Sequence, residues 1–220
     1  MVYKVVIFDL DGTLLDTLET LAYYGNLALE KWGYTPYEKD AYRYMVGSGA
    51  KNLIRRMLQK QGKETEEAFE KVYKTYIQAY HNNTLYKTAV YPGIKALLEA
   101  LSQKGLRLGV LSNKPHEATV PILKSFFGEN LFTVMRGGMD GVPLKPDPTA
   151  ALQIAEEMGA KPEECLYVGD TAVDMETGKR AGFYTIGVLW GFRDFEELSA
   201  AGADRIIERP GEILSYLEER

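Results

Sequence analysis

Short apolar segments that end abruptly in polar residues or glycine recur along the chain. They occupy residues 3–8, 106–111, 165–168, 185–189 and, more weakly, 205–207. Each has the length of a β-strand and is rich in β-branched or aromatic residues. Such near-continuous apolar runs are typical of strands that are buried on both faces of a sheet.

The segments between these runs repeat with a helical period. Residues 93–104 and 148–158 are each predicted to gather apolar side chains on one stripe, which comprises Ile94, Leu97, Leu98 and Leu101 in the first and Leu152, Ala155 and Met158 in the second. Strands that alternate with helices of this length indicate βαβ units. We therefore expect an α/β fold, with a Rossmann-like parallel sheet core and helices on both faces.

One long stretch breaks the alternation, because it contains only helical patterns. The expected helices cover residues 17–31, 38–46, 50–61 and 65–80. The chain is expected to return to the sheet near Tyr91-Pro92-Gly93, where proline and glycine punctuate it. We predict a core formed by residues 1–14 and 88–220, with residues 15–87 inserted as an all-helical cap.

Composition excludes several classes of protein. The 220 residues have a formal net charge of −5, whereas nucleic-acid and anionic-membrane binders need a basic face. Cys165 is the one cysteine, so an intramolecular disulfide and a cysteine-clustered metal site are excluded. No export signal or run long enough to span a membrane is evident. We expect a cytoplasmic monomer or homodimer with no nucleic-acid or membrane partner.

Candidate chemistry begins where the first apolar run ends, at Asp9-Leu10-Asp11-Gly12-Thr13. The carboxyl ends of strands are where ligands bind in open α/β sheets. Two carboxylates this close together are costly unless a cation or a shared proton relieves their repulsion. The alternative is an ordinary turn before a helix, since aspartate, glycine and threonine are common turn residues.

Two later strand ends are polar as well. Ser112 and Asn113 follow the second run, and Gly169 and Asp170, with Asp174 four residues further on, follow the third. Each group could simply cap a helix, but parallel strands bring their carboxyl ends to one edge. The convergence favours an oxygen-rich site suited to Mg²⁺.

In this order, the segments resemble the four motifs of the haloacid dehalogenase-like phosphohydrolase superfamily. The motifs are Asp9-Leu10-Asp11-Gly12-Thr13, then Ser112, then Lys145 within Leu144-Lys145-Pro146, then Gly169-Asp170 with Asp174. A solvated loop lysine is the alternative for Lys145 taken alone. The helical insertion is similar to the cap of the family's first subclass.

The resemblance implies a role for each motif residue. Asp9 would attack phosphorus and form an aspartyl phosphate, and Asp11 would be the general acid and then the general base. Mg²⁺ would lie between Asp9, the backbone carbonyl of Asp11, and Asp170. The phosphoryl group would be bound by Thr13, Ser112, Asn113 and Lys145. The supporting residues would be Gly169 and Asp174, the latter orienting Lys145 or a metal-bound water.

A finer resemblance lies in the insertion. Val46-Gly47-Ser48-Gly49-Ala50 resembles the cap loop of phosphoglycolate phosphatases, and so does Ser112-Asn113-Lys114-Pro115 in the core. Gly47, Ser48 and Gly49 are therefore candidates for substrate contact, with Lys51 or Arg55 available for a substrate carboxylate. The alternative is a plain connection between helices that carries solvated basic residues.

The expected function is Mg²⁺-dependent hydrolysis of a small phosphorylated metabolite, with 2-phosphoglycolate as the first candidate. A phosphomutase of the β-phosphoglucomutase type, an inorganic pyrophosphatase and a sugar phosphatase stay open. A further alternative is an inactive phosphate-binding protein on the same fold. Asp11 favours phosphoryl chemistry over dehalogenation, because a halide leaving group needs no acid.

Overall fold

The computed structural model describes residues 3–218 of the chain, and a parallel sheet forms its centre. The strand order is β5-β4-β1-β6-β7-β8, and every pairing is parallel. The strands are β1 (Val5–Phe8), β4 (Arg107–Pro115), β5 (Val134–Gly138), β6 (Cys165–Gly169), β7 (Tyr184–Val188) and β8 (Arg205–Ile207). The predicted α/β class with a parallel sheet is confirmed.

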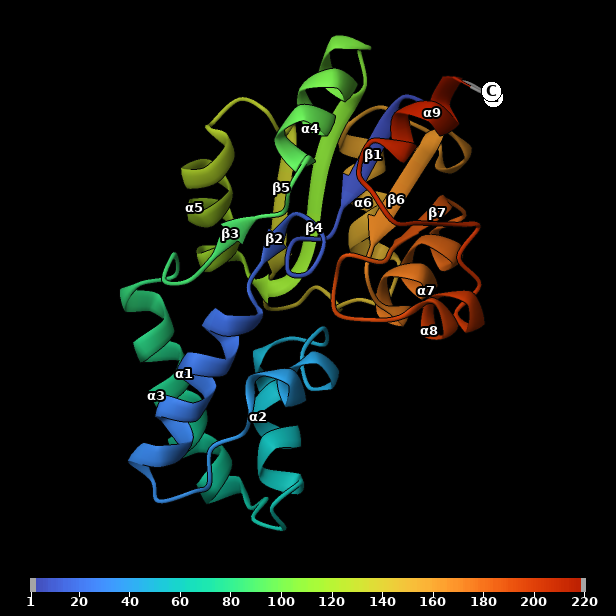
Figure 1. Cartoon of the computed structure of the whole chain (residues 1–220). Helices are drawn as coiled ribbons and strands as arrows, with labels where there is room; N and C mark the ends of the chain where they lie inside the picture. Colours follow the sequence, from blue (N-terminus) through green and yellow to red (C-terminus); the bar gives the residue numbers. More distant parts are fainter. Residues whose placement is uncertain (1–2, 219–220) are drawn as a thin grey trace.

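Helices cover both faces of the sheet (Figure 1), which explains why the inner strands β1 and β6 carry no charged residue. Val6 and Phe8 of β1 pack into one apolar cluster, and Val5 and Ile7 pack into the other. The first face carries α4 (Ile94–Gln103), α5 (His116–Phe127) and α9 (Glu212–Glu218). The second carries α6 (Thr149–Glu157), α7 (Ala172–Ala181) and α8 (Phe195–Ala200), and the short helix η2 (Pro162–Glu164) leads into β6.

A bundle of helices, here called the helical insertion, lies beyond the carboxyl ends of the strands (Figure 1). It comprises α1 (Leu18–Lys31), η1 (Lys39–Tyr44), α2 (Ala50–Gln59) and α3 (Glu66–Asn82). Two connections join it to the sheet, and these pair as the antiparallel strands β2 (Leu15–Asp16) and β3 (Ala89–Val90). Its tyrosines Tyr42, Tyr76 and Tyr80 are buried, so they help to form the interior of the bundle.

Four details differ from the sequence-based expectation. The edge strand β5 was not predicted, because its segment Val134–Gly138 contains arginine and two glycines and has no apolar run. The second strand continues to Pro115, and the helix begins at His116. The segment expected as a helix over 38–46 is a 3₁₀-helix, Lys39–Tyr44. Leu152 is exposed, since α6 buries Ala150, Ala151, Ile154 and Ala155 against the sheet.

Candidate active site

The end of β1 delivers Asp9 and Asp11 to the edge of the sheet that faces the helical insertion. Asp9 follows the strand directly, and its N–H donates to the carbonyl of Val168 at 2.9 Å. The chain then turns at Gly12, where φ is +91°. A Cβ atom on Gly12 would lie 2.2 Å from Oδ2 of Asp170, so this turn requires glycine.

Lys145, in the loop between β5 and α6, lies at the centre of a buried charge cluster. Its Nζ donates to Oδ1 of Asp9 and to Oδ1 of Asp174, both at 2.7 Å, and to the carbonyl of Leu111 at 3.1 Å. Burial lowers the pKa of Lys145, but the charges of Asp174 and Asp9 outweigh burial and hold that pKa well above its usual value. The two carboxylates therefore favour the charged form of Lys145.

Three carboxylates converge at this edge of the sheet. Asp9, Asp170 and Asp174 each place one oxygen within 4.8 Å of the others. Burial, reinforced by Asp174 and Asp9, raises the pKa of Asp170 well above its ordinary value. Burial also raises the pKa of Asp9 to about 7, although Lys145 opposes the rise. The cluster has more negative charge than Lys145 balances, which is an environment suited to a divalent cation.

Local structure positions the two aspartates that follow β6. Oδ1 of Asp170 accepts a hydrogen bond from Thr13 at 3.2 Å, and Oδ2 accepts one from the Phe192 N–H at 2.8 Å. Oδ2 of Asp174 accepts bonds from the N–H and the hydroxyl of Thr171, at 3.1 and 2.7 Å. Asp174 thus caps α7 and holds Lys145 at once.

Asp11 lies apart from this cluster and is paired with Lys114. The Nζ of Lys114 donates to both oxygens of the carboxylate, at 2.8 and 2.6 Å. The Lys114 side chain is only 4% exposed. Burial lowers its pKa, but the charge of Asp11 outweighs burial, so the pKa is raised. Each aspartate of the first motif therefore has its own buried lysine.

Ser112 and Asn113 organise the backbone around these lysines. The Ser112 hydroxyl accepts a hydrogen bond from the Lys114 N–H at 3.2 Å. The Asn113 side chain accepts from the Lys145 N–H at 2.9 Å and donates to the carbonyls of Lys145 and Gly47 at 3.1 and 3.2 Å. Asn113, predicted to bind phosphate, thus joins the Lys145 loop to the helical insertion.

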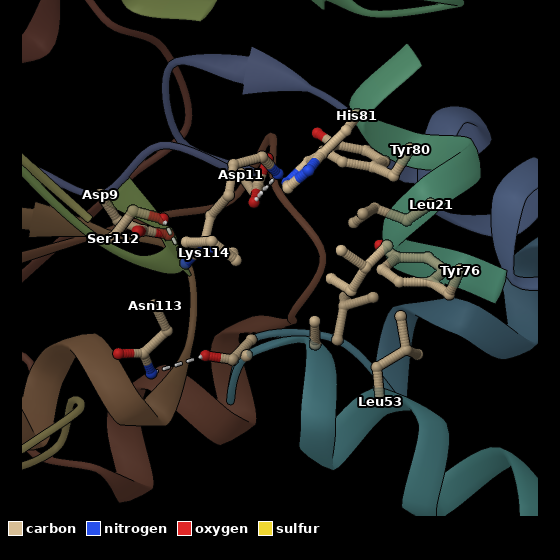
Figure 2. Close-up of a pocket in the computed structure, with 16 residues that line it drawn as sticks. Asp9, Asp11, Leu21, Leu53, Tyr76, Tyr80, His81, Ser112, Asn113 and Lys114 are labelled. Carbon is tan, nitrogen blue, oxygen red and sulfur yellow. Dashed lines mark hydrogen bonds and ion pairs between the residues drawn. The ribbon is translucent and has the colours of Figure 1, made fainter. Parts of the chain in front are cut away.

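A pocket opens between the end of the sheet and the helical insertion (Figure 2). From the core it is lined by Asp9, Asp11, Ser112, Asn113, Lys114 and Pro115. From the insertion it is lined by Leu21, Val46, Gly47, Gly49, Ala50, Leu53, Tyr76, Ile77, Tyr80 and His81. The charged side chains of the core therefore face a mostly apolar wall formed by the insertion.

Of the five cap residues predicted to contact substrate, Gly47 and Gly49 line the pocket. Ser48 does not line it, and its hydroxyl accepts a hydrogen bond from Arg56 at 3.0 Å. Lys51 is exposed outside the pocket lining. Arg55 pairs with Glu64 and Glu66 on the outer surface. The structure thus gives neither basic residue a place in the pocket.

The pocket residues that sequence reasoning missed include Lys114, Tyr80 and His81. Lys114 belongs to a quoted motif, but a lysine next to a helix gives no sign that it is buried. A tyrosine within a helical pattern gives no sign of a site, and His81 lies 70 residues from Asp11 in sequence. Cys165 lies outside the pocket and is buried, and burial raises the pKa of its thiol to about 12.

The fold and the carboxylate cluster together define a class of enzyme. The family model for haloacid dehalogenase-like hydrolases matches residues 6–188. This chain belongs to the haloacid dehalogenase-like hydrolase family, as its four motifs predicted.

Individual relatives place it more closely. It is 35% identical to a phosphoglycolate phosphatase of Aquifex aeolicus, over 98% of this chain and 97% of the relative. It is 30% identical to one of Haemophilus influenzae, over 98% of both. A crystal structure of a predicted phosphoglycolate phosphatase from Haemophilus somnus has a TM-score of 0.90 and 30% identity, with 97% of each chain covered. The expectation of a phosphatase of the phosphoglycolate phosphatase-like group is confirmed.

No helix within residues 3–218 is both long and apolar enough to cross a membrane.

Proposed function

We propose that this phosphatase hydrolyses 2-phosphoglycolate, with Mg²⁺, through an aspartyl phosphate on Asp9. The observation that carries the proposal is the pair of carboxylates that follow β1, Asp9 and Asp11, each held by its own buried lysine and both lining one pocket. The names of the relatives support the substrate.

In the proposed first step, a carboxylate oxygen of Asp9 attacks phosphorus and the bond from phosphorus to the ester oxygen breaks. Asp11 donates a proton to that leaving oxygen. In the second step water attacks phosphorus and gives its proton to Asp11. The bond from Asp9 to phosphorus then breaks, which releases inorganic phosphate, restores the Asp9 carboxylate and leaves Asp11 protonated for the next turnover.

Lys145 performs two tasks in this scheme. It holds Asp9 in place through the 2.7 Å ion pair, and its charge offsets the negative charge on the phosphoryl oxygens. Asp174 is a positioning residue, because it acts through Lys145. Ser112 lines the pocket beside Asp9, where its hydroxyl is available to a phosphoryl oxygen. Thr13 supports Asp170 instead, through its 3.2 Å hydrogen bond.

The donor set fits a hard divalent cation. Asp9 and Asp170 are buried, their pKa values are raised by that burial, and carboxylate oxygens are the ligands that Mg²⁺ prefers. Asp174 completes the group of three, but both of its oxygens already accept hydrogen bonds. When bound, Mg²⁺ would neutralise the carboxylates and lower the barrier to the approach of an anionic nucleophile to an anionic phosphoryl group.

We propose the helical insertion, residues 15–87, as the cap over this site. The contacts across the pocket support this role: Asn113 donates to the carbonyl of Gly47, and Arg193 donates to the carbonyl of Val46 at 3.2 Å. A wall that covers the pocket excludes bulk water while Asp9 reacts.

The test is phosphate release with Mg²⁺ over a panel of 2-phosphoglycolate, pyrophosphate, β-glucose 1-phosphate and nucleoside monophosphates. We expect the highest kcat/KM with 2-phosphoglycolate and loss of activity with EDTA. Isomerisation of β-glucose 1-phosphate with little phosphate released would replace the proposal by the mutase alternative. No turnover of any ester, with or without EDTA, would indicate an inactive phosphate-binding protein.

A further inference from the structure

We propose that Lys114, together with Tyr80 and His81, binds a carboxylate on the leaving group of the substrate. Lys114 exchanges Asp11 for this carboxylate when substrate enters. The inference rests on the proposed phosphatase function and assigns the residues that select the substrate.

Lys114 already holds a carboxylate in the structure. It donates to both oxygens of Asp11, at 2.8 and 2.6 Å, and both residues line the pocket. A buried ammonium group needs an anionic partner. A substrate carboxylate that enters beside Asp11 therefore offers Lys114 an equivalent partner, while the released side chain of Asp11 becomes free to turn toward the leaving oxygen.

Tyr80 supplies an unused polar group at the same place. Its side chain is 3% exposed, and its hydroxyl has no hydrogen-bond partner within residues 3–218. Its ring centre lies 5.1 Å from Nζ of Lys114, near enough for that charge to oppose the rise in the phenol pKa that burial causes. A buried hydroxyl without a partner costs free energy that a bound carboxylate would recover.

His81 adjoins Tyr80 on α3 and also lines the pocket. Figure 2 shows its imidazole on the same side of the pocket as Asp11 and the Tyr80 ring. An imidazole ring carries an N–H donor whether it is neutral or charged. Three donors from the two sides of the pocket thus surround the space next to Asp11.

The position matches the covalent structure of a short phosphorylated acid. Asp11 has to reach the leaving oxygen in order to protonate it. In 2-phosphoglycolate, one methylene carbon separates that oxygen from the carboxylate. Lys114 contacts Asp11 directly, at 2.6 Å. When Asp11 contacts the leaving oxygen, Lys114 is therefore close enough to contact the substrate carboxylate one carbon further along.

The rest of the insertion wall disfavours sugar phosphates. It consists of Leu21, Val46, Ala50, Leu53, Tyr76 and Ile77, with the two glycines of the loop. The Tyr76 hydroxyl is the one polar side-chain atom among these residues. A sugar would leave several hydroxyl groups against apolar carbon, and each unpaired polar group weakens binding.

The test compares 2-phosphoglycolate with ethyl phosphate, which replaces the carboxylate by a methyl group. In Lys114→Met, we expect the ratio of their kcat/KM values to fall at least about tenfold, the loss of one charge-assisted hydrogen bond. The matched control is Lys74→Met, an exposed lysine on α3, which should keep the parent ratio. Lys114→Arg should retain part of the preference, because it retains the charge.

Three outcomes would overturn the inference. Equal losses on both substrates would show that Lys114 only positions Asp11. A fallen ratio in Lys51→Met, with none in Lys114→Met, would assign the carboxylate to the outer basic residues. A loss confined to pyrophosphate, used as a third substrate, would identify the second anion as a phosphate.

Two further measurements distinguish a failure of this inference from a failure of the proposed function. If the parent protein hydrolyses neither ester, the proposed function fails, and calorimetric binding of the two esters with Mg²⁺ still compares Lys114→Met with its parent. If Lys114→Met does not fold by circular dichroism, Tyr80→Phe and His81→Leu are measured in the same way. A ratio unchanged in both variants would then contradict the inference.

Discussion

The two sides of the pocket are built on different principles. On the core side, Lys114 and Lys145 form buried ion pairs with Asp11, Asp9 and Asp174. On the insertion side the wall is largely apolar, and contacts to the core use backbone carbonyls such as those of Gly47 and Val46. In the proposed function the core therefore supplies the reacting groups and Lys114, whereas the insertion encloses the pocket and adds Tyr80 and His81.

Removal of the proposed nucleophile is expected to have the largest effect. Asp9→Asn should lower kcat by about 10⁴-fold or more, because an amide cannot form the aspartyl phosphate. The control is Asp140→Asn, an exposed aspartate that should leave kcat at the parent value. Rates of release of inorganic phosphate give the comparison, and an Asp9→Asn variant as fast as its parent would exclude the proposed nucleophile.

A smaller but still severe effect is expected at the turn after β1. Gly12→Ala would force a Cβ atom to within 2.2 Å of Asp170, at a φ of +91° that disfavours side chains. We expect a loss of about 3 kcal/mol in the free energy of unfolding, together with most of the activity.

The matched control for this turn is Gly105→Ala. Gly105 has a φ of +80°, but no atom lies within 4 Å of its added Cβ. Gly105→Ala should lower the free energy of unfolding by only about 1 kcal/mol, because it introduces backbone strain but no clash. Urea denaturation of both variants makes the comparison, and equal losses would show that the crowding at Asp170 is unimportant.

The stability of the protein should depend on pH, because the carboxylates of the buried cluster have raised pKa values. The pKa of Asp9 rises on folding from 3.8 to about 7, so between these pH values the native state binds more protons than the unfolded state. The metal-free protein should therefore lose on the order of 2 kcal/mol of stability as pH rises from 5 to 7. The raised pKa of Asp170 acts in the same direction.

Mg²⁺ competes with protons for these carboxylates, so it should raise the melting temperature more at pH 7 than at pH 5. Thermal unfolding with EDTA and with Mg²⁺ at the two pH values provides the measurement. An equal shift at both pH values would place metal binding elsewhere.

The smallest effect is expected on the outer surface of the insertion. Arg55→Ala removes ion pairs to Glu64 and Glu66 and a contact with the Phe69 ring, but no group that lines the pocket. Exposed ion pairs stabilise a protein little. We expect a slight fall in melting temperature and a kcat/KM for 2-phosphoglycolate within about twofold of the parent value. A large rise in KM would restore Arg55 as a substrate contact.

The comparison also explains which parts of the fold were predictable. Strands β1 and β6 and the first half of β4 are buried on both faces, so their apolar runs are visible in the sequence. The edge strand β5 lacks that signal. It is a strand because it pairs with β4, and this pairing leaves no local pattern in the sequence. Leu152 was predicted on the buried face of its helix, but it is exposed. The spacing of apolar residues predicts a helix, whereas the surface on which the helix packs decides which side is buried.

The parallel sheet and the strand-end positions of Asp9 and Asp170 follow from local patterns in the sequence, and the order of the motifs, which includes Ser112 and Lys145, indicated the family. Only the tertiary structure decided the pairings. Lys145 meets Asp9 across 136 residues, and Lys114 meets Asp11 across 103. His81 reaches the same pocket from α3, and Arg55 turns away from it. Such partners depend on how separate elements pack, which no local pattern of side chains records.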